Sequence, residues 1–342
     1  MKPYKILSLF ALAAAALLVA ACQSDDFEGL ADGRCPIAFD AQLGWEKDQT
    51  RANIQTAANL DKFKVTCVKR NASKGDSYYF QNLVVTKSGG TWTNATNYYW
   101  LATGQETYDF YAYAPVGGVT VTNPTTPGAP TFTYDASTTN CDLTAAVVTG
   151  KSDRPTSADA AKVNLAFDHL LTGIRFKVAD ACDAISIKSI KITGIYFSGK
   201  CTYSSGKWQW SELATNASKK IERTLSFNTS GSDKNIDNPT TEASFFVIPQ
   251  TIPSGAKVEL TYNNGTTDQT LSADLSGTWT QGKVVTYAIG VQASEPTVNF
   301  TFGLNDGVVV NWDGTTGGAT QKTAWTTGDI IYVGFKNQKT GL

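Results

Sequence analysis

The segment Cys35-Pro-Ile-Ala-Phe-Asp-Ala-Gln-Leu-Gly-Trp45 alternates apolar residues with polar, small or proline residues. Successive side chains of an extended strand point to opposite faces, so every second residue shares a face. One face of this segment carries Cys35, Ile37, Phe39, Ala41, Leu43 and Trp45. The pattern predicts a half-buried β-strand whose apolar face packs against a core.

Short strand patterns of the same kind follow along most of the chain. Aromatic-rich runs at residues 78–85, 98–101 and 108–114 are bounded by Gly, Asn or Pro, and long helical periodicities are absent. Many short strands separated by turn residues predict an all-β protein built of β-sandwiches, not a parallel α/β sheet. A polar connector precedes Lys162, where the strand pattern restarts. We therefore expect two domains, at residues 52–161 and 162–292.

The N-terminus has the features of a lipoprotein signal peptide. Lys2 and Lys5 precede an apolar run from Ile6 to Ala20, and small residues stand before Cys22. The apolar run is too short to span a membrane. A basic start, a short apolar stretch and small residues before the cut predict a signal peptide at residues 1–21 and lipid attachment at Cys22.

A second processing point is expected between Arg51 and Ala52. Residues 46–50 are polar and poor in strand or helix formers, so a trypsin-like protease could reach the bond that follows them. A cut there would make residues 22–51 a propeptide. It would remove the lipid anchor and the strand at 35–45 together, which suggests an assembly switch.

The C-terminal extension, residues 293–342, carries strands of the same pattern. Val298, Phe300, Phe302 and Leu304 share one face, and Ile331, Val333 and Phe335 alternate in the same way further on. One removable strand and one terminal strand are what strand exchange between subunits requires. The extension is either a donor strand or the start of a further module.

Composition favours a structural role. Charged residues make up 17%, and 29 Lys and Arg nearly balance 30 Asp and Glu, so no basic face favours nucleic acid. His169 is the only histidine, and no Cys-x-x-Cys pair occurs. His-based catalysis and zinc binding therefore have little support. We expect no enzyme activity, no cofactor and no metal.

The cysteines allow a disulfide prediction. If Cys22 carries lipid and Cys35 leaves with the propeptide, four cysteines remain. An exported protein can keep disulfides, and one bond in each domain would pair Cys67 with Cys141 and Cys182 with Cys201. The alternative is that these are small buried hydrophobic residues in strands.

Four segments resemble the fimbrillins, which are subunits of type V pili in Bacteroidetes. Their order and spacing along the chain carry the resemblance more than any single segment does. The matching segments are Tyr108-Asp-Phe-Tyr-Ala-Tyr-Ala-Pro115, Phe167-Asp-His-Leu-Leu-Thr-Gly-Ile-Arg-Phe-Lys-Val178, Phe245-Phe-Val-Ile-Pro-Gln250 and Trp279-Thr-Gln-Gly-Lys-Val-Val-Thr-Tyr-Ala-Ile-Gly290.

The resemblance implies two tandem transthyretin-like β-sandwich domains plus a C-terminal strand extension. It also implies a lipoprotein precursor in the cell outer membrane, cleavage after an Arg by a surface protease, and polymerisation into a cell-surface fimbrium by donor-strand exchange. Arg51 stands at the family's cleavage position, whereas Arg34 would leave the strand in place and Arg70 would cut inside the fold. Residues 23–26, Gln-Ser-Asp-Asp, resemble the signal that sends Bacteroidetes lipoproteins to the outer face of that membrane, or form an ordinary linker.

The partners implied are other copies of the chain or related fimbrillins, outer-membrane lipid before cleavage, and a host or bacterial surface receptor or glycan. The long extension favours a stalk subunit, because a tip needs no donor strand; tip and anchor roles are the alternatives.

A second hypothesis is a surface lipoprotein that binds glycans. Trp208 and Trp210 share one strand face, and Tyr98, Tyr99 and Trp100 cluster near a further tryptophan, Trp92. If exposed, these rings could stack on sugars. If buried, they belong to the sandwich core, which is the reading that we favour.

Overall fold

The computed structural model describes residues 35–43, 60–155, 161–179, 182–231, 236, 245–292, 297–304 and 331–334. Every named element in these ranges is a β-strand, which confirms the expected all-β sandwich class. The expected signal peptide, Cys22, Trp45 and the Arg51-Ala52 bond lie outside the described residues. Within the described part, no helix has the length and hydropathy that a membrane span needs.

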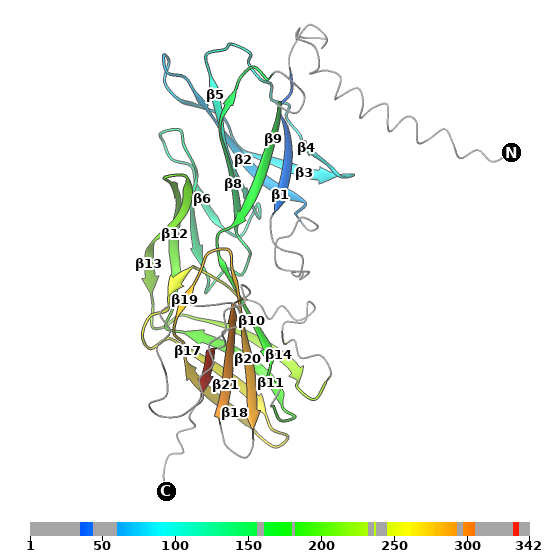
Figure 1. Ribbon diagram of the computed structural model, residues 1–342, viewed down its shortest axis with the longest axis vertical. Helices are drawn as coiled ribbons and strands as arrows, with labels where there is room; N and C mark the ends of the chain where they lie inside the picture. Colours follow the sequence, from blue (N-terminus) through cyan, green and yellow to red (C-terminus); the bar gives the residue numbers. More distant parts are fainter. Residues whose placement is uncertain are drawn as a thin grey trace, which may run out of the picture.

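The first half of the chain forms a seven-stranded sheet in the order β1-β9-β8-β5-β2-β3-β4 (Figure 1). Its strands are β1 (Ala38–Leu43), β2 (Lys62–Arg70), β3 (Ser77–Ser88), β4 (Thr91–Asn94), β5 (Thr107–Ala114), β8 (Thr144–Ser152) and β9 (Lys162–His169).

This sheet curls around its own core. β1 and β4 stand at opposite ends of the strand order, yet they contact each other. The β8–β9 ladder contains two residue pairs, Thr144 with His169 and Ala145 with Asp168, so most of β9 diverges from β8. Buried aromatic residues such as Phe63, Phe110 and Phe167 fill the interior. The two ends of the sheet therefore close over one hydrophobic cluster.

The second half contains two sheets that face each other. One has the order β15-β10-β20-β21-β22 and the other β14-β11-β17-β18. The strands are β10 (Thr172–Val178), β11 (Ser186–Thr193), β14 (Lys220–Asn228), β15 (Phe245–Val247), β17 (Lys257–Asn263), β18 (Asp268–Asp274), β20 (Val284–Gln292), β21 (Thr297–Leu304) and β22 (Ile331–Gly334). Ile, Val, Leu and Phe residues of both sheets form one buried cluster.

A further sheet joins segments from both halves, in the order β13-β12-β7-β6. β6 (Thr120–Thr122) and β7 (Thr131–Asp135) come from the first half, and β12 (Tyr196–Ser204) and β13 (Lys207–Thr215) from the second. A short pair, β16 (Gln250–Thr251) with β19 (Thr278–Trp279), lies nearby (Figure 1). Phe132 and Tyr134 of β7 belong to the same buried cluster as the second half. The two halves thus share a sheet and part of a core.

The division between domains stays a prediction, but strand pairing bears on where it falls. β9, which begins at Lys162, pairs with β1 and β8 of the first sheet. The next strand, β10, pairs with β15 and β20 of the second half. Pairing therefore favours a division just after His169 over one at Lys162.

Buried polar contacts fix the chain at this crossing. The Nδ1 atom of His169 lies 2.8 Å from Oδ2 of Asp142, and both side chains are buried. The backbone N–H of Leu170 donates to the carbonyl oxygen of Leu143 (2.8 Å), and Nε1 of Trp210 donates to the carbonyl oxygen of Leu170 (2.7 Å). The histidine is therefore part of a structural junction.

Two turn glycines provide a test of packing in the second half. Gly194, between β11 and β12, has φ +74°, and a Cβ there would lie 2.8 Å from Cα of Ala256. Gly206, between β12 and β13, has φ +78° and open space around the same position. Gly206→Ala should cost roughly 1–2 kcal/mol from the left-handed backbone. Gly194→Ala should cost at least about 1 kcal/mol more, because backbone must move. Urea unfolding of both variants measures the difference, and equal costs would contradict the packing.

Candidate functional site: the slot filled by β1

The segment from Cys35 to Leu43 fills a gap between two parts of the first sheet. β1 runs parallel to β9 in a register from Ala38 opposite Lys162 to Leu43 opposite Phe167. Figure 1 shows the two strands side by side.

The residues just before β1 pair on the opposite side, with residues 98–100. The backbone N–H of Ile37 donates to the carbonyl oxygen of Tyr98 (2.8 Å), and that of Trp100 donates to the carbonyl oxygen of Cys35 (2.9 Å). Pro36 and Tyr99 form an antiparallel bridge. The segment is therefore paired along two borders, and its backbone closes the curled sheet.

The burial of this segment follows the alternation expected from the sequence. Cys35, Ile37, Phe39 and Leu43 are at most 8% exposed. Ala41 is partly buried and packs against the same cluster. Two residues of the other face, Ala38 and Gln42, are exposed.

Phe39 makes the most specific contacts in the slot. Its ring lies 6.1 Å from the ring of Phe63, at 83° between planes, and 6.1 Å from the ring of Phe110, at 80°. Edge-to-face pairs of this kind add about 0.5–1.5 kcal/mol each beyond the area that they bury. Phe167 of the neighbouring strand packs on Phe63 at 5.4 Å. The slot is therefore an aromatic pocket that accepts a large apolar side chain at its centre.

The sequence profile of the fimbrillin-like family matches residues 50–312. This chain belongs to the fimbrillin-like family. No curated protein is similar enough to match it.

Solved structures share the fold of this fimbrillin-like chain. A fimbrial protein from Bacteroides vulgatus ATCC 8482 superposes with a TM-score of 0.55 at 16% identity, covering 79% of this chain and 98% of that one. A putative cell adhesion protein from Bacteroides uniformis ATCC 8492 has a TM-score of 0.53 at 18% identity, covering 81% and 99%. A putative cell adhesion protein from Bacteroides ovatus ATCC 8483 has a TM-score of 0.53 at 16% identity, covering 79% and 95%. At these identities the likeness establishes the fold alone.

The candidate donor strand of this fimbrillin-like chain lies on its own second half. β21 runs antiparallel to β20, from Val285 opposite Leu304 to Val291 opposite Val298. β22 pairs with β21 in turn. The segment that carries Val298, Phe300, Phe302 and Leu304 thus has strand geometry between β20 and β22, and its role as a donor stays a prediction.

Arg70 is held in the fold and is a poor cleavage site. Its Nε atom lies 2.7 Å from Asp109 Oδ2, and its Nη1 atom lies 2.6 Å from Asp76 Oδ2. Its Nη2 atom donates to the hydroxyl of Tyr111 (3.2 Å). Burial lowers the pKa of Arg70, but the hydrogen bonds to Asp109 and Asp76 outweigh it and raise the pKa overall. A cut after this residue would separate β2, which ends there, from β3, with which it pairs.

The expected disulfides are not formed. None of the cysteines in the described part forms a disulfide; these are Cys35, Cys67, Cys141, Cys182 and Cys201. Cys67 packs in the first hydrophobic cluster and Cys141 against the second, which explains why that pair does not meet. Burial raises the pKa of both Cys141 and Cys201 to about 12, so these thiols stay protonated and unreactive. Cys67 and Cys201 are fully buried, so they fit the alternative prediction of small buried hydrophobic residues in strands.

The burial of Trp100 and Trp208 contradicts the hypothesis that these rings are exposed for stacking on sugars. Trp100 is 2% exposed and its Nε1 donates to the carbonyl oxygen of Ala161 (3.1 Å). Trp208 is 7% exposed and packs on Phe132 at 5.0 Å. Trp210 packs against the same cluster. Trp100 and Trp208 are therefore core residues, and Trp210 is partly buried.

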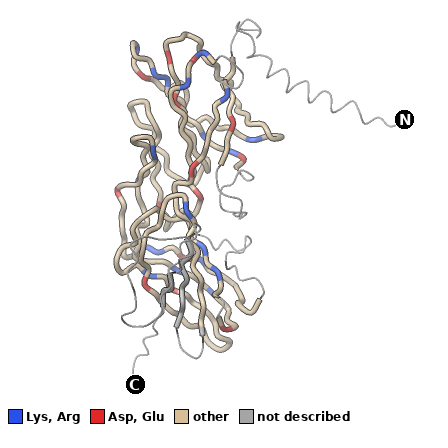
Figure 2. The backbone as a smooth tube through the Cα atoms, in the orientation of Figure 1, with Lys and Arg blue, Asp and Glu red and all other residues tan. Residues whose placement is uncertain are grey.

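The described ranges offer little support for a metal site or for a surface of one charge sign. No group of three or more His, Cys, Asp or Glu side chains is placed to hold a metal ion there. Figure 2 shows basic and acidic residues interspersed along the backbone of both halves. The feature that stands out is therefore the strand-filled slot.

Removing the central ring of the slot tests its contribution to stability. Phe39→Ala should cost about 3–5 kcal/mol, because it leaves a cavity between Phe63 and Phe110. Gln42→Ala, on the exposed face of the same strand, should change stability by no more than about 0.5 kcal/mol. Denaturant unfolding of both full-length variants gives the comparison. Equal effects would show that β1 does not pack as described.

Proposed function

We propose that this chain is a subunit of a cell-surface fimbrium that assembles by exchanging β1 for a strand of another copy. The observation that carries the proposal is that segment 35–43 closes the first sheet while it lies N-terminal to the arginine at position 51. Membership of the fimbrillin-like family supports a fimbrial role. The fold shared with fimbrial and cell adhesion proteins is consistent with it.

Processing begins, in this proposal, with export and attachment of lipid at Cys22. The subunit then sits in the cell outer membrane as a lipoprotein precursor. A cut between Arg51 and Ala52 severs the covalent link between β1 and the strand that begins at Lys62. β1 is then held by its pairing with β9 and by its buried side chains, so it can be displaced.

The replacement strand is proposed to come from the C-terminal extension of a second copy or of a related fimbrillin. Val298, Phe300, Phe302 and Leu304 repeat the every-second-residue pattern of Ile37, Phe39, Ala41 and Leu43. Each large apolar side chain buried this way contributes roughly 1.5–3 kcal/mol. The donor strand must leave its pairing with β20 and β22, so the exchange gains most from filling a slot that would otherwise be open.

The long extension favours a stalk position, because a stalk subunit must both receive and donate a strand. An anchor would keep its lipid and β1, and a tip would need no donor. Surface adhesion through a host or bacterial receptor or glycan is the role that we propose for the finished fimbrium.

Blocking the cut tests the processing step. Arg51→Ala should be exported and lipidated but remain monomeric. β1 stays covalently linked in this variant, so it outcompetes a strand from another copy for the slot. Gel electrophoresis of unheated surface extracts separates monomer from polymer. Ladders of polymer from this variant would reject the proposal.

Charges in the candidate donor strand test the exchange step. Replacing Phe300 and Phe302 together with Asp should abolish polymerisation, since a buried carboxylate would find no partner in the slot. Thr301→Asp, which the alternation places on the opposite face, is the matched control and should polymerise. The same extracts provide the readout. Normal polymer from the double variant would assign the donor strand elsewhere.

A further inference from the structure

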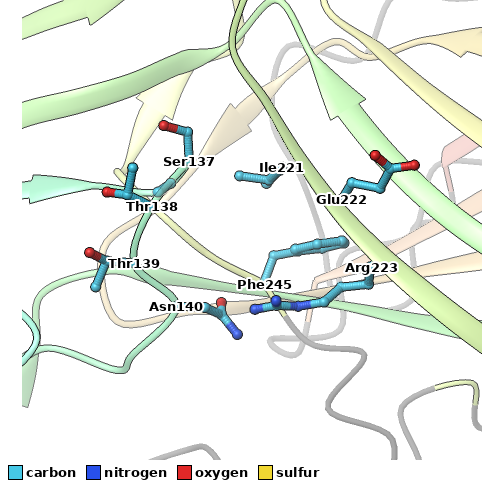
Figure 3. Close-up of a pocket in the computed structure, with 9 residues that line it drawn as sticks. Ser137, Thr138, Thr139, Asn140, Ile221, Glu222, Arg223 and Phe245 are labelled. Carbon is cyan, nitrogen blue, oxygen red and sulfur yellow. The ribbon is translucent and has the colours of Figure 1, made fainter.

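A small pocket lies in the second half, apart from the slot. Its volume is about 100 Å³. It is lined by the loop at residues 136–140, by β14 residues Ile221, Glu222 and Arg223, and by Phe245 at the start of β15 (Figure 3). A dry cavity of roughly 150 Å³ can hold benzene, so this pocket has room for about four non-hydrogen atoms.

The cation of the pocket is Arg223. Its guanidinium lies over the ring of Phe245, 5.6 Å from the ring centroid, and Figure 3 shows it extending towards Asn140. Its Nε atom is buried and has no hydrogen-bond partner. A buried N–H donor without a partner is unfavourable, so the guanidinium is not fully satisfied by the protein.

The charged neighbours of Arg223 are already paired with one another. Glu222, adjacent on β14, forms an ion pair with Lys220, and Lys219 forms one with Asp135. In Figure 3 the carboxylate of Glu222 points away from the guanidinium. Among the residues that the structure describes, no acidic side chain forms an ion pair with Arg223.

The loop on the opposite wall is rigidly held. Oδ1 of Asp135 accepts hydrogen bonds from the backbone N–H (2.9 Å) and the hydroxyl (2.6 Å) of Ser137. Oδ1 of Asn140 accepts the backbone N–H of Phe246 (3.0 Å). The wall therefore keeps its shape and presents polar side chains opposite the cation.

We propose that this pocket binds the carboxylate of a small aliphatic acid. The guanidinium fork matches a carboxylate with two parallel hydrogen bonds. The Phe245 ring holds the plane of the fork, and the polar loop contacts the rest of the ligand. The volume holds about four non-hydrogen atoms of such an acid, and its far end reaches solvent. This site is independent of the proposed strand exchange.

Propionate and its neutral analogue propionamide test the proposal on the full chain. Ligand-observed NMR should show saturable propionate binding with a Kd on the order of millimolar, which suits so small a ligand. Propionamide should bind at least about tenfold more weakly, because it cannot accept two charge-assisted bonds.

Two variants assign the binding to Arg223. Arg223→Gln should weaken propionate binding at least about tenfold, and Lys207→Gln, which removes an exposed cation of β13 outside the pocket lining, should leave the Kd within about twofold. Arg223→Lys keeps the charge and should give an intermediate Kd. An unchanged thermal midpoint establishes that each variant is folded, and if Arg223→Gln is not, Arg223→Lys decides the matter.

Three results would overturn the proposal. These are no propionate binding up to ~50 mM, equal binding of propionate and propionamide, and equal binding by the native chain and the folded Arg223 variants.

Discussion

The parallel pairing of β1 with β9 is the contact on which the first half of the molecule depends. The two strands are separated by more than a hundred residues, so no local turn holds them together. Their ladder and the contacts of Phe39 with Phe63 and Phe110 bring the ends of a curled sheet together. Because side chains and backbone hold β1, its covalent link to the chain is not what gives the sheet its shape. A strand of similar pattern could take its place.

Alternation in the sequence predicted which faces of the strands are buried, and this succeeded at Ile37, Phe39 and Leu43. A period of two is imposed by backbone geometry, so it survives in any sheet that has one buried face. It does not say which strand lies alongside. The parallel partner of β1, the membership of β9 in the first sheet and the joint sheet of β7 with β12 therefore needed the structure.

The contacts of the cysteines and of the aromatic residues likewise could not be predicted from the sequence. Counting could pair Cys67 with Cys141, but distance in the fold is set by strand pairing, which places them in different clusters. The sequence alone could not decide whether Trp100 and Trp208 form a binding surface or belong to the core, because the residue types are the same in both cases. Their burial follows from the layers that cover them. Arg223 gave no signal in the sequence, because its pocket is formed by a distant loop.

The two halves of the molecule are joined by a shared sheet and by buried polar contacts. β7 and β12 pair directly, and Tyr134 of β7 donates to the carbonyl oxygen of Phe246 (3.1 Å). His169 and Asp142 are buried where the chain crosses. Separating the halves would expose a shared core and unpair these groups, which is costly. The slot in the first half and the extension on the second are thus linked through packed structure.

The most direct test is the intact mass of subunits recovered from fibres sheared off cells and dissociated by heating. We expect subunits whose first residue is Ala52 and whose mass excludes Cys35–Leu43. Subunits from assembled fibres that still contain β1 would contradict it.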